Sequence, residues 1–288
     1  MVCFHFAILF AAVFFCGCVE RVIGLKQVEV EDPLCAQHVP CWTDKKQGRK
    51  KQCVPLRVVI GAAKSGTDLL WNLLATHPEL AVSPKRSRKE LNFLNYHAKT
   101  LWSDNAKEWA KMTPLFDDTV HVGSIDLSTR YLTSKDAPVT MFRAFEYGNR
   151  ALSRCVRLVV VLRDPVEQLF SMYRYFAYKL HRETRTSQRE FEAFVTEGME
   201  KLRSCRKPLP PPPRFTYFGQ HNMSTPWQER DAHCFITRRF HSEEETYYLR
   251  YPLYAFQLSR WQTFFNLRTQ LLVLRFEDFD GAQGIQRQ

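Results

Sequence analysis

The chain has 288 residues, of which 45% are hydrophobic, so it can bury one sizeable core. Its 41 Lys and Arg residues exceed its 30 Asp and Glu residues, and the net charge of +11 favours acidic partners. The sequence has no internal repeat and no nucleic-acid-binding motif, so we expect no nucleic-acid partner. An anionic glycan and an anionic cofactor fit the charge equally well.

The first segment of interest is an uncharged, mostly apolar stretch, Val2–Val19. Its 18 residues lie at the lower limit for a membrane span, and they also suit a signal peptide cleaved near Cys16-Gly17-Cys18. Both alternatives export the rest of the chain, with residues 20–55 as a cysteine-bearing stem or linker. No Lys or Arg precedes the stretch, which weakens the anchor alternative because cytosolic basic residues set membrane orientation.

The cysteines suggest disulfides. Three of the nine lie in or beside the apolar stretch, and the other six are Cys35, Cys41, Cys53, Cys155, Cys205 and Cys234. An even number in an exported domain fits disulfide bonding, although connectivity stays open. We favour a Cys205–Cys234 bridge around a proline-rich loop that also carries the glycosylation sequon Asn222-Met223-Ser224. No two cysteines have Cys-x₂-Cys spacing, so we expect no zinc site.

The most informative segment predicts a strand, a loop and a helix. The strand Leu56–Ile60 ends at Gly61, and after the loop 62–67 leucines recur at helical spacing over residues 69–74. Such a loop directs backbone N–H groups and the positive end of the helix toward a bound anion. Lys64 adds a full positive charge and Thr67 adds a hydroxyl. The simplest alternative is an ordinary strand-to-helix turn.

This loop differs from the phosphate loop of nucleotide-binding proteins. That motif places lysine directly after its second glycine, followed by serine or threonine. Here Lys64 comes two residues before Gly66, and Thr67 and Asp68 follow the glycine. The residues that would grip the β- and γ-phosphates and Mg²⁺ are therefore missing.

A second segment also combines a buried strand with phosphate chemistry. Leu158–Leu162 is a continuous apolar run, typical of a parallel strand buried on both faces. Pro165 suits the first turn of the helix that follows. Arg163 ends the strand and Ser171 follows eight residues later, so we expect both at the same end of the sheet. A guanidinium and a hydroxyl suit a phosphate group. Alternatively, Arg163 only pairs with Asp164 or a nearby glutamate.

The whole pattern predicts an α/β fold with a parallel sheet covered by helices on both faces. Helical patterns, such as Arg189–Leu202 and Tyr251–Phe265, alternate with apolar runs. The five predicted strands are Leu56–Ile60, Leu80–Ser83, Val120–Ile125, Leu158–Leu162 and Leu271–Leu274.

The two segments together resemble the sulfotransferases that use 3′-phosphoadenosine 5′-phosphosulfate (PAPS). The Lys64–Thr67 sequence K-S-G-T is similar to their 5′-phosphosulfate loop, and Arg163 with Ser171 is similar to their 3′-phosphate pair. The resemblance spans residues 56 to about 280. It implies a three-layer sandwich like that of P-loop NTPases, in a sulfotransferase domain of residues 56–288. Members of the family continue into a basic C-terminal loop, so the resemblance implies that this domain is truncated.

Weaker matches resemble the Golgi glycosaminoglycan branch, including members similar to N-acetylgalactosamine 4-sulfate 6-O-sulfotransferase. Pro84-Lys85 and Lys89–Phe93 together resemble their P-K-E-x-H-F stretch, with Arg86-Ser87-Arg88 inserted between them and Asn92 in place of the histidine. Asp126–Tyr131 resembles an acidic-x-Ser-Pro-x-Tyr turn, and Leu271–Phe279 resembles a late strand ending in Glu-Asp. The resemblance implies that Glu90 is the base for the acceptor hydroxyl. The alternatives for this role are His97 and His121.

The resemblance implies sulfuryl transfer from PAPS to a glycan hydroxyl, without a metal, by a Golgi membrane protein with a luminal domain or by a secreted one. Lys64 would relieve charge on the leaving phosphate oxygen. The residues implied in donor binding are Lys64, Ser65, Gly66, Thr67, Asp68, Arg163 and Ser171. A non-catalytic, glycan-binding pseudo-sulfotransferase is the main alternative. A nucleotide kinase is a weaker one because of the position of Lys64.

Overall fold

A computed structural model describes residues 40–43, 50–82, 89–96, 102–115, 117, 119–121, 123–146, 152–177, 187–203 and 248–279. The chain divides into two compact units, one of residues 1–163 and 259–288 and one of residues 164–258. The expected apolar segment 2–19, the Cys205–Cys234 bridge and the sequon at Asn222 lie outside the described residues. Within those ranges, none of the helices combines the length and the apolar character that crossing a membrane requires.

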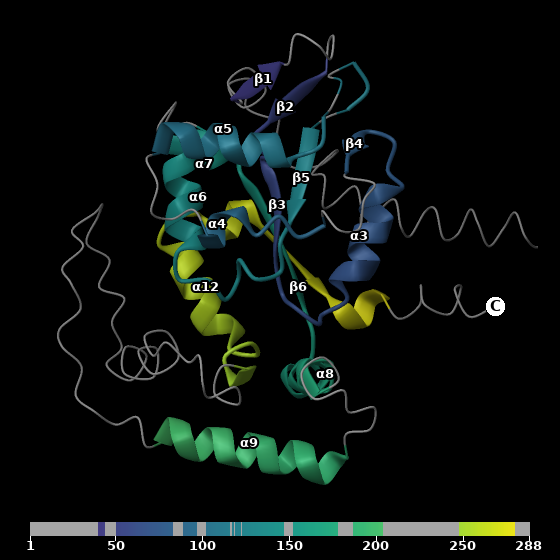
Figure 1. Ribbon diagram of the computed structural model, residues 1–288, viewed down its shortest axis with the longest axis vertical. Helices are drawn as coiled ribbons and strands as arrows, with labels where there is room; N and C mark the ends of the chain where they lie inside the picture. Colours follow the sequence, from purple (N-terminus) through teal and green to yellow (C-terminus); the bar gives the residue numbers. More distant parts are fainter. Residues whose placement is uncertain are drawn as a thin grey trace, which may run out of the picture. The chain divides into compact units, whose positions relative to one another are not determined.

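The first unit is built on a five-stranded parallel sheet with the strand order β4-β5-β3-β6-β7 (Figure 1). Each of the five predicted strands is present, although the strand expected at Val120–Ile125 begins at Gly123 instead. Their bounds are β3 Arg57–Gly61, β4 Leu80–Ala81, β5 Gly123–Leu127, β6 Arg157–Leu162 and β7 Leu271–Arg275. The central strand β3 is buried along its whole length, as its continuous apolar run predicts. The order places the carboxyl ends of β5, β3 and β6 side by side.

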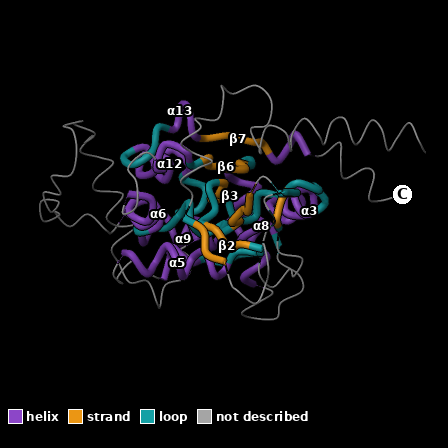
Figure 2. The backbone as a smooth tube through the Cα atoms, turned by 90° about the horizontal axis from the view of Figure 1, so that it is seen from above, coloured by secondary structure: helices purple, strands orange, loops and turns teal. Residues whose placement is uncertain are grey.

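Helices cover both faces of this sheet, which confirms the predicted three-layer α/β fold. Helix α3 (Thr67–Ala75) lies against one face, and α6 (Ala137–Glu146) lies on the opposite side (Figures 1 and 2). The core between α3 and the sheet is formed by Val59, Leu70, Trp71, Leu74, Leu80, Ile125, Leu127, Val159, Val161, Leu274 and Phe279. Val58 and Ile60 are also fully buried and alternate with Val59, because successive strand residues point to opposite faces.

The remaining helices of the first unit are α4 Phe93–Tyr96, α5 Trp102–Met112, α7 Leu152–Cys155, α13 Leu267–Gln270 and the 3₁₀-helix η4 Phe276–Phe279. The second unit contains α8 (Pro165–Phe176) and α9 (Gln188–Arg203), and α12 (Tyr254–Gln262) begins in it and ends in the first. Pro165 opens α8 as predicted, and the Asp164 carboxylate caps it by accepting from Val166 N and Glu167 N.

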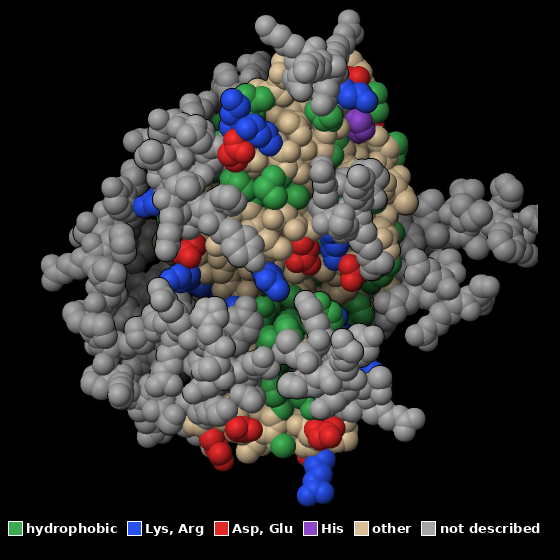
Figure 3. Space-filling view, viewed as in Figure 1, with side chains coloured by type: hydrophobic (Ala, Val, Ile, Leu, Met, Phe, Trp, Pro, Cys, Tyr) green, Lys and Arg blue, Asp and Glu red, His purple; other side chains and the backbone are tan. Residues whose placement is uncertain are grey.

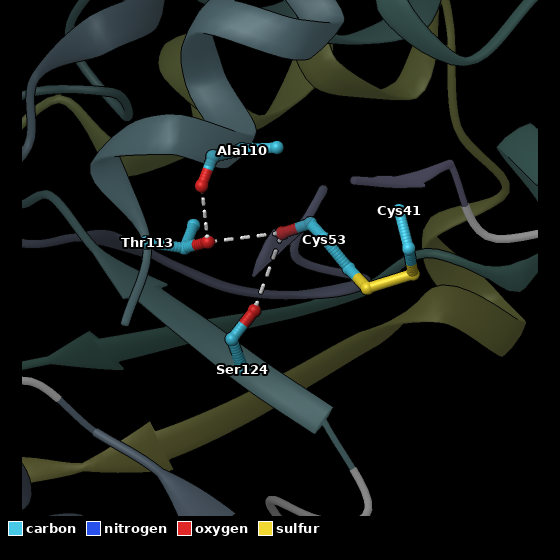
Figure 4. Close-up of a disulfide and its surroundings, with 5 residues drawn as sticks. All are labelled: Cys41, Cys53, Ala110, Thr113 and Ser124. Carbon is cyan, nitrogen blue, oxygen red and sulfur yellow. Dashed lines mark hydrogen bonds between the residues drawn. A yellow bond between two sulfur atoms is a disulfide. The ribbon is translucent and has the colours of Figure 1, made fainter. Parts of the chain in front are cut away.

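Part of the expected stem is folded onto the sheet unit. β1 (Cys41–Thr43) and β2 (Lys51–Cys53) form an antiparallel pair, and a disulfide joins Cys41 to Cys53 (Figure 4). The Cys53 carbonyl accepts hydrogen bonds from Thr113 Oγ1 at 3.1 Å and from Ser124 Oγ at 3.5 Å (Figure 4). Because Thr113 follows α5 and Ser124 lies in β5, the disulfide-bonded pair is attached to both elements. Cys155 is disulfide-bonded as well.

Candidate functional site

The loop between β3 and α3 has the geometry of an anion site. Gly66 is the N-cap of α3 in a left-handed conformation, with φ of 80°, and no side-chain hydrogen bond caps the helix. Lys64, with φ of 65°, is also left-handed. The first amides of a helix have no partner within the helix, and the positive end of the helix dipole lies there. An anion with oxygen acceptors can satisfy these amides.

Ser65 adds a second feature of an anion site. Its side chain is fully buried, and its hydroxyl has no hydrogen-bond partner among the residues that the structure describes. A buried polar group without a partner costs about 1–3 kcal/mol, so an oxygen acceptor from a ligand would relieve this cost. The Ser65 backbone N–H already donates to Ala62 O, at 3.3 Å. Its hydroxyl is therefore the better donor to an anion than its amide.

Arg163 lies beside the loop, as the sequence predicts. Its Nη1 donates to the Lys64 carbonyl at 3.4 Å, and its guanidinium lies over the Phe276 ring, 4.6 Å from the ring centroid. The same ring covers Gly66, where a Cβ atom would lie only 2.4 Å from the Phe276 ring. Sequence reasoning missed Phe276, although its place directly after the last strand put it at the carboxyl edge of the sheet.

The predicted base Glu90 is held next to the carboxyl end of β5. Its Oε1 accepts a hydrogen bond from Thr129 Oγ1 at 3.0 Å. The preceding residue, Lys89, is buried and forms an ion pair with Asp68 in the first turn of α3. Glu90 is thus linked to two elements whose ends face the same edge of the sheet as the loop.

Of the two histidine alternatives, His121 lies away from the carboxyl edge of the sheet, and His97 is outside the described residues. His121 precedes Gly123, the first residue of β5, and its Nδ1 accepts from Asp117 N. It lies at the amino end of the strand, whereas Glu90 contacts the turn after the carboxyl end. Because the strands are parallel, His121 is at the opposite edge from Lys64.

Asp126 is a fully buried acid at the end of β5 that sequence reasoning did not assign to the site. Its carboxylate accepts hydrogen bonds from Ser128 Oγ at 2.7 Å, Tyr131 Oη at 2.8 Å and Trp109 Nε1 at 2.9 Å. Burial raises the pKa of Asp126 to about 6, and the charge of Glu90 raises it further while the three hydrogen bonds lower it. Burial also raises the pKa of Tyr131 well above its ordinary value, so Tyr131 is neutral.

The remaining predicted donor residues lie on two helices. Thr67 is buried as the first residue of α3, and the Asp68 side chain is exposed and paired with Lys89. Ser171 is half-buried in α8 of the second unit. Its pairing with Arg163 stays a prediction.

The charged side chains of the described residues do not form one large basic patch on the face drawn in Figure 3. Blue Lys and Arg side chains there lie singly or beside red acidic ones. Among the described residues, no three His, Cys, Asp or Glu side chains are grouped as metal ligands. The features that suit a ligand are those of the loop and its neighbours.

This chain is similar in sequence to known sulfotransferases. No family model matches the chain. The membrane-associated sulfotransferase kil1 of Dictyostelium discoideum is 30% identical over 159 residues, which cover 54% of this chain and 30% of that protein. Carbohydrate sulfotransferase 15 of Homo sapiens is 28% identical, over 54% of this chain and 32% of that protein. Carbohydrate sulfotransferase 15 of Rattus norvegicus is 24% identical, over 79% of this chain and 41% of that protein. The chain thus spans between about a third and two fifths of the length of these relatives.

A solved structure is also similar. The sulfotransferase from Alicyclobacillus acidocaldarius is 21% identical, with a TM-score of 0.47 over 80% of this chain and 77% of that chain.

We expect Gly66→Ala to lower the free energy of unfolding by about 2–4 kcal/mol. An added methyl group would strain the left-handed backbone and press on the Phe276 ring. In a Phe276→Ala background only the backbone strain remains, so the same substitution should cost about 1–2 kcal/mol. Urea unfolding of wild type, Gly66→Ala, Phe276→Ala and the double variant measures the cost of Gly66→Ala in each background. Equal costs in the two backgrounds would show that Phe276 does not cover Gly66.

The buried carboxyl of Asp126 predicts a pH-dependent difference in stability between wild type and Asp126→Asn. Between pH 4 and 6 the native state holds a proton that the unfolded chain has released, so this contribution to stability is lost as pH rises through 6. We expect the difference in unfolding free energy, wild type minus variant, to fall by about 3 kcal/mol from pH 4 to 7. Each pH unit between the unfolded and the folded pKa of Asp126 contributes about 1.4 kcal/mol. Urea unfolding across this range measures it, and a constant difference would contradict the prediction.

Proposed function

We propose that this chain, a distant relative of the sulfotransferases, transfers a sulfuryl group from PAPS to a hydroxyl group of a glycan. The observation that carries the proposal is the loop after β3. There a helix start without a side-chain cap, the Lys64 cation and a buried Ser65 hydroxyl with no hydrogen-bond partner among the described residues lie within four residues of one another. This combination suits an anion that brings several oxygen acceptors, as a phosphosulfate does.

The residues around the loop fit the two ends of PAPS. The first turn of α3, with Ser65 and Thr67, would hold the 5′-phosphosulfate. Arg163 would hold the 3′-phosphate, because its guanidinium is already fixed by the Lys64 carbonyl and the Phe276 ring. Ser171 stays a prediction from the sequence for the same phosphate.

The proposed reaction is a displacement at sulfur. The acceptor hydroxyl oxygen bonds to the sulfur as the bond between sulfur and the bridging phosphate oxygen breaks. The Glu90 carboxylate takes the hydroxyl proton, and 3′-phosphoadenosine 5′-phosphate leaves with the bond electrons. Lys64 stabilises the negative charge that develops on the leaving oxygen.

The glycan acceptor and the compartment are supported by separate observations. Two of the relatives are named carbohydrate sulfotransferases, and the net charge of +11 suits an anionic glycan. The Cys41–Cys53 disulfide is typical of an oxidising compartment. Together with the apolar Val2–Val19 segment, it supports a luminal domain on a Golgi membrane protein or a secreted protein.

The direct test uses full-length protein from the secretory pathway, radiolabelled PAPS and a panel of sulfated and unsulfated glycans. Label transfer to a glycan is the expected result. Binding of 3′-phosphoadenosine 5′-phosphate without transfer to any glycan would favour a pseudo-sulfotransferase. Competition by ATP with Mg²⁺ and phosphoryl transfer would favour a nucleotide kinase.

Lys64→Ala should leave the fold intact and lower the transfer rate about 10²–10³-fold. The substitution removes a preorganised charge at the developing oxyanion, and alanine carries the same left-handed backbone cost as lysine. Lys107→Ala, at an exposed position of α5, is the matched control and should keep wild-type turnover. Turnover by Lys64→Ala within threefold of wild type would show that this loop does not hold the transferred group.

Glu90→Gln should bind 3′-phosphoadenosine 5′-phosphate normally but lower kcat about 10²–10⁴-fold. Glutamine can still accept from Thr129, but it cannot take the proton of the acceptor hydroxyl. The control is Glu79→Gln, at an exposed position before β4. Calorimetry gives the dissociation constant and label transfer gives kcat. A kcat within threefold of wild type would remove Glu90 from the mechanism.

A further inference from the structure

We propose that Asp126 is a positioning residue that acts through Ser128 and Tyr131 to hold the segment carrying Glu90 at the phosphate loop. The proposal rests on the proposed function, because it assigns Asp126 a role through the base. Asp126 touches neither the loop nor an expected substrate atom. Its effect on the reaction would pass through the backbone of residues 90–94.

The first part of the argument is the direction of the hydrogen bonds around Asp126. Ser128 Oγ donates to one carboxylate oxygen, and Tyr131 Oη and Trp109 Nε1 donate to the other. A carboxylate accepts all three bonds, whereas an amide presents its N–H₂ group to at least one of the three donors. The charge of Asp126 therefore fixes which way the two hydroxyl protons point.

The two oriented hydroxyls hold the backbone of the Glu90 segment. Because the Ser128 proton points to Asp126, its oxygen is free to accept from Asn92 N, at 2.9 Å. In the same way, Tyr131 Oη accepts from Leu94 N, at 3.4 Å. One buried charge thus organises two hydrogen bonds to main-chain groups that follow Glu90 by two and four residues.

The segment needs such side-chain contacts because it has little regular structure. Residues 89–92 lie outside helices and strands, and α4 after them is a single turn. Asn92 has φ of 50°, a left-handed conformation that asparagine adopts more readily than most residues but that still needs local contacts to hold it. The hydrogen bond from Asn92 N to Ser128 Oγ holds this conformation. On the other side, Phe93 stacks on Trp109 with their rings nearly parallel.

The turn that holds the segment is itself fixed to the strand leading into the phosphate loop. Ser128 N donates to Val59 O at 3.0 Å, and Leu132 N donates to Ile60 O at 2.7 Å. Thr129, between them, donates directly to Glu90. The distance between the base and the donor loop is therefore set by the bonds of this turn to β3.

Charge gives a readout that a purely structural role would not have. The titratable groups that act on Asp126 are Glu90 and the neutral Tyr131. Burial raises the pKa of Asp126 to about 6, so protonation below that pH removes the charge that orients the two hydroxyls. Wild-type kcat should therefore fall as pH drops through 6, and Asp126→Asn should lack this step in addition to having a lower kcat.

The deciding experiment is a double-mutant cycle of wild type, Asp126→Asn, Glu90→Gln and the double variant, assayed at pH 7.5 with saturating PAPS and acceptor. We expect Asp126→Asn to lower kcat about 10–100-fold, with the dissociation constant of 3′-phosphoadenosine 5′-phosphate within twofold of wild type. Because Asp126 acts through Glu90, it should cause no further loss in the Glu90→Gln background. The matched control, Asp136→Asn before α6, should stay within twofold of wild type.

A second variant keeps the test decisive if Asp126→Asn does not fold. Ser128→Ala removes only the hydroxyl that donates to Asp126 and accepts from the Asn92 amide. It should lower kcat about 3–30-fold, again with no further loss in the Glu90→Gln background. Unfolding by urea confirms that each assayed protein is folded.

The outcomes separate the two proposals. A low kcat in Glu90→Gln together with an unchanged kcat in Asp126→Asn, or in Ser128→Ala, would overturn the positioning role and keep the base. Losses that multiply in the double variant would also overturn it, because Asp126 would then act independently of Glu90. Wild-type turnover by Glu90→Gln would overturn the base assignment, and the positioning role with it.

Discussion

The structure depends on the parallel packing of β5, β3 and β6. A strand buried on both faces cannot shift its register without moving apolar side chains into the wrong layer, so the three carboxyl ends are fixed relative to one another. Each end carries one part of the candidate site. The loop with Lys64 follows β3, Arg163 follows β6, and the turn that holds Glu90 follows β5.

The charges at this edge differ in how they are compensated. Asp126 is fully buried, yet it accepts three hydrogen bonds, which offset much of the cost of removing a carboxylate from water. Buried Lys89 has the Asp68 carboxylate as its partner, and this pair ties the Glu90 segment to the first turn of α3. Because the Asp68 side chain is exposed, the pair gains little net stability, and its role is better explained as fixing the position of the segment.

Much of the fold could be predicted from the sequence, because a short continuous apolar run such as Leu158–Leu162 is typical of a strand buried on both faces. The loop at Lys64 and the position of Arg163 were predictable for the same reason, since both directly follow such runs. Phe276 was not, because its role comes from contacts with Gly66 and Arg163, far away in the chain. Asp126 was not, because its neighbours Ser128 and Tyr131 accept from amides 36 and 37 residues earlier. The Cys41–Cys53 bond was also not predicted, because three-residue strands leave no readable pattern.

Backbone strain gives an independent indication of where the function lies. Within the described parts of the chain, the non-glycine residues with positive φ are Lys64 and Asn92, and both belong to the candidate site. Such conformations persist only where surrounding contacts enforce them. Here Arg163 donates to the Lys64 carbonyl, and Ser128 accepts from the Asn92 amide. The fold thus gives up stability at two points, one for the proposed donor loop and one for the proposed base, and the three-strand edge keeps them in a fixed relation.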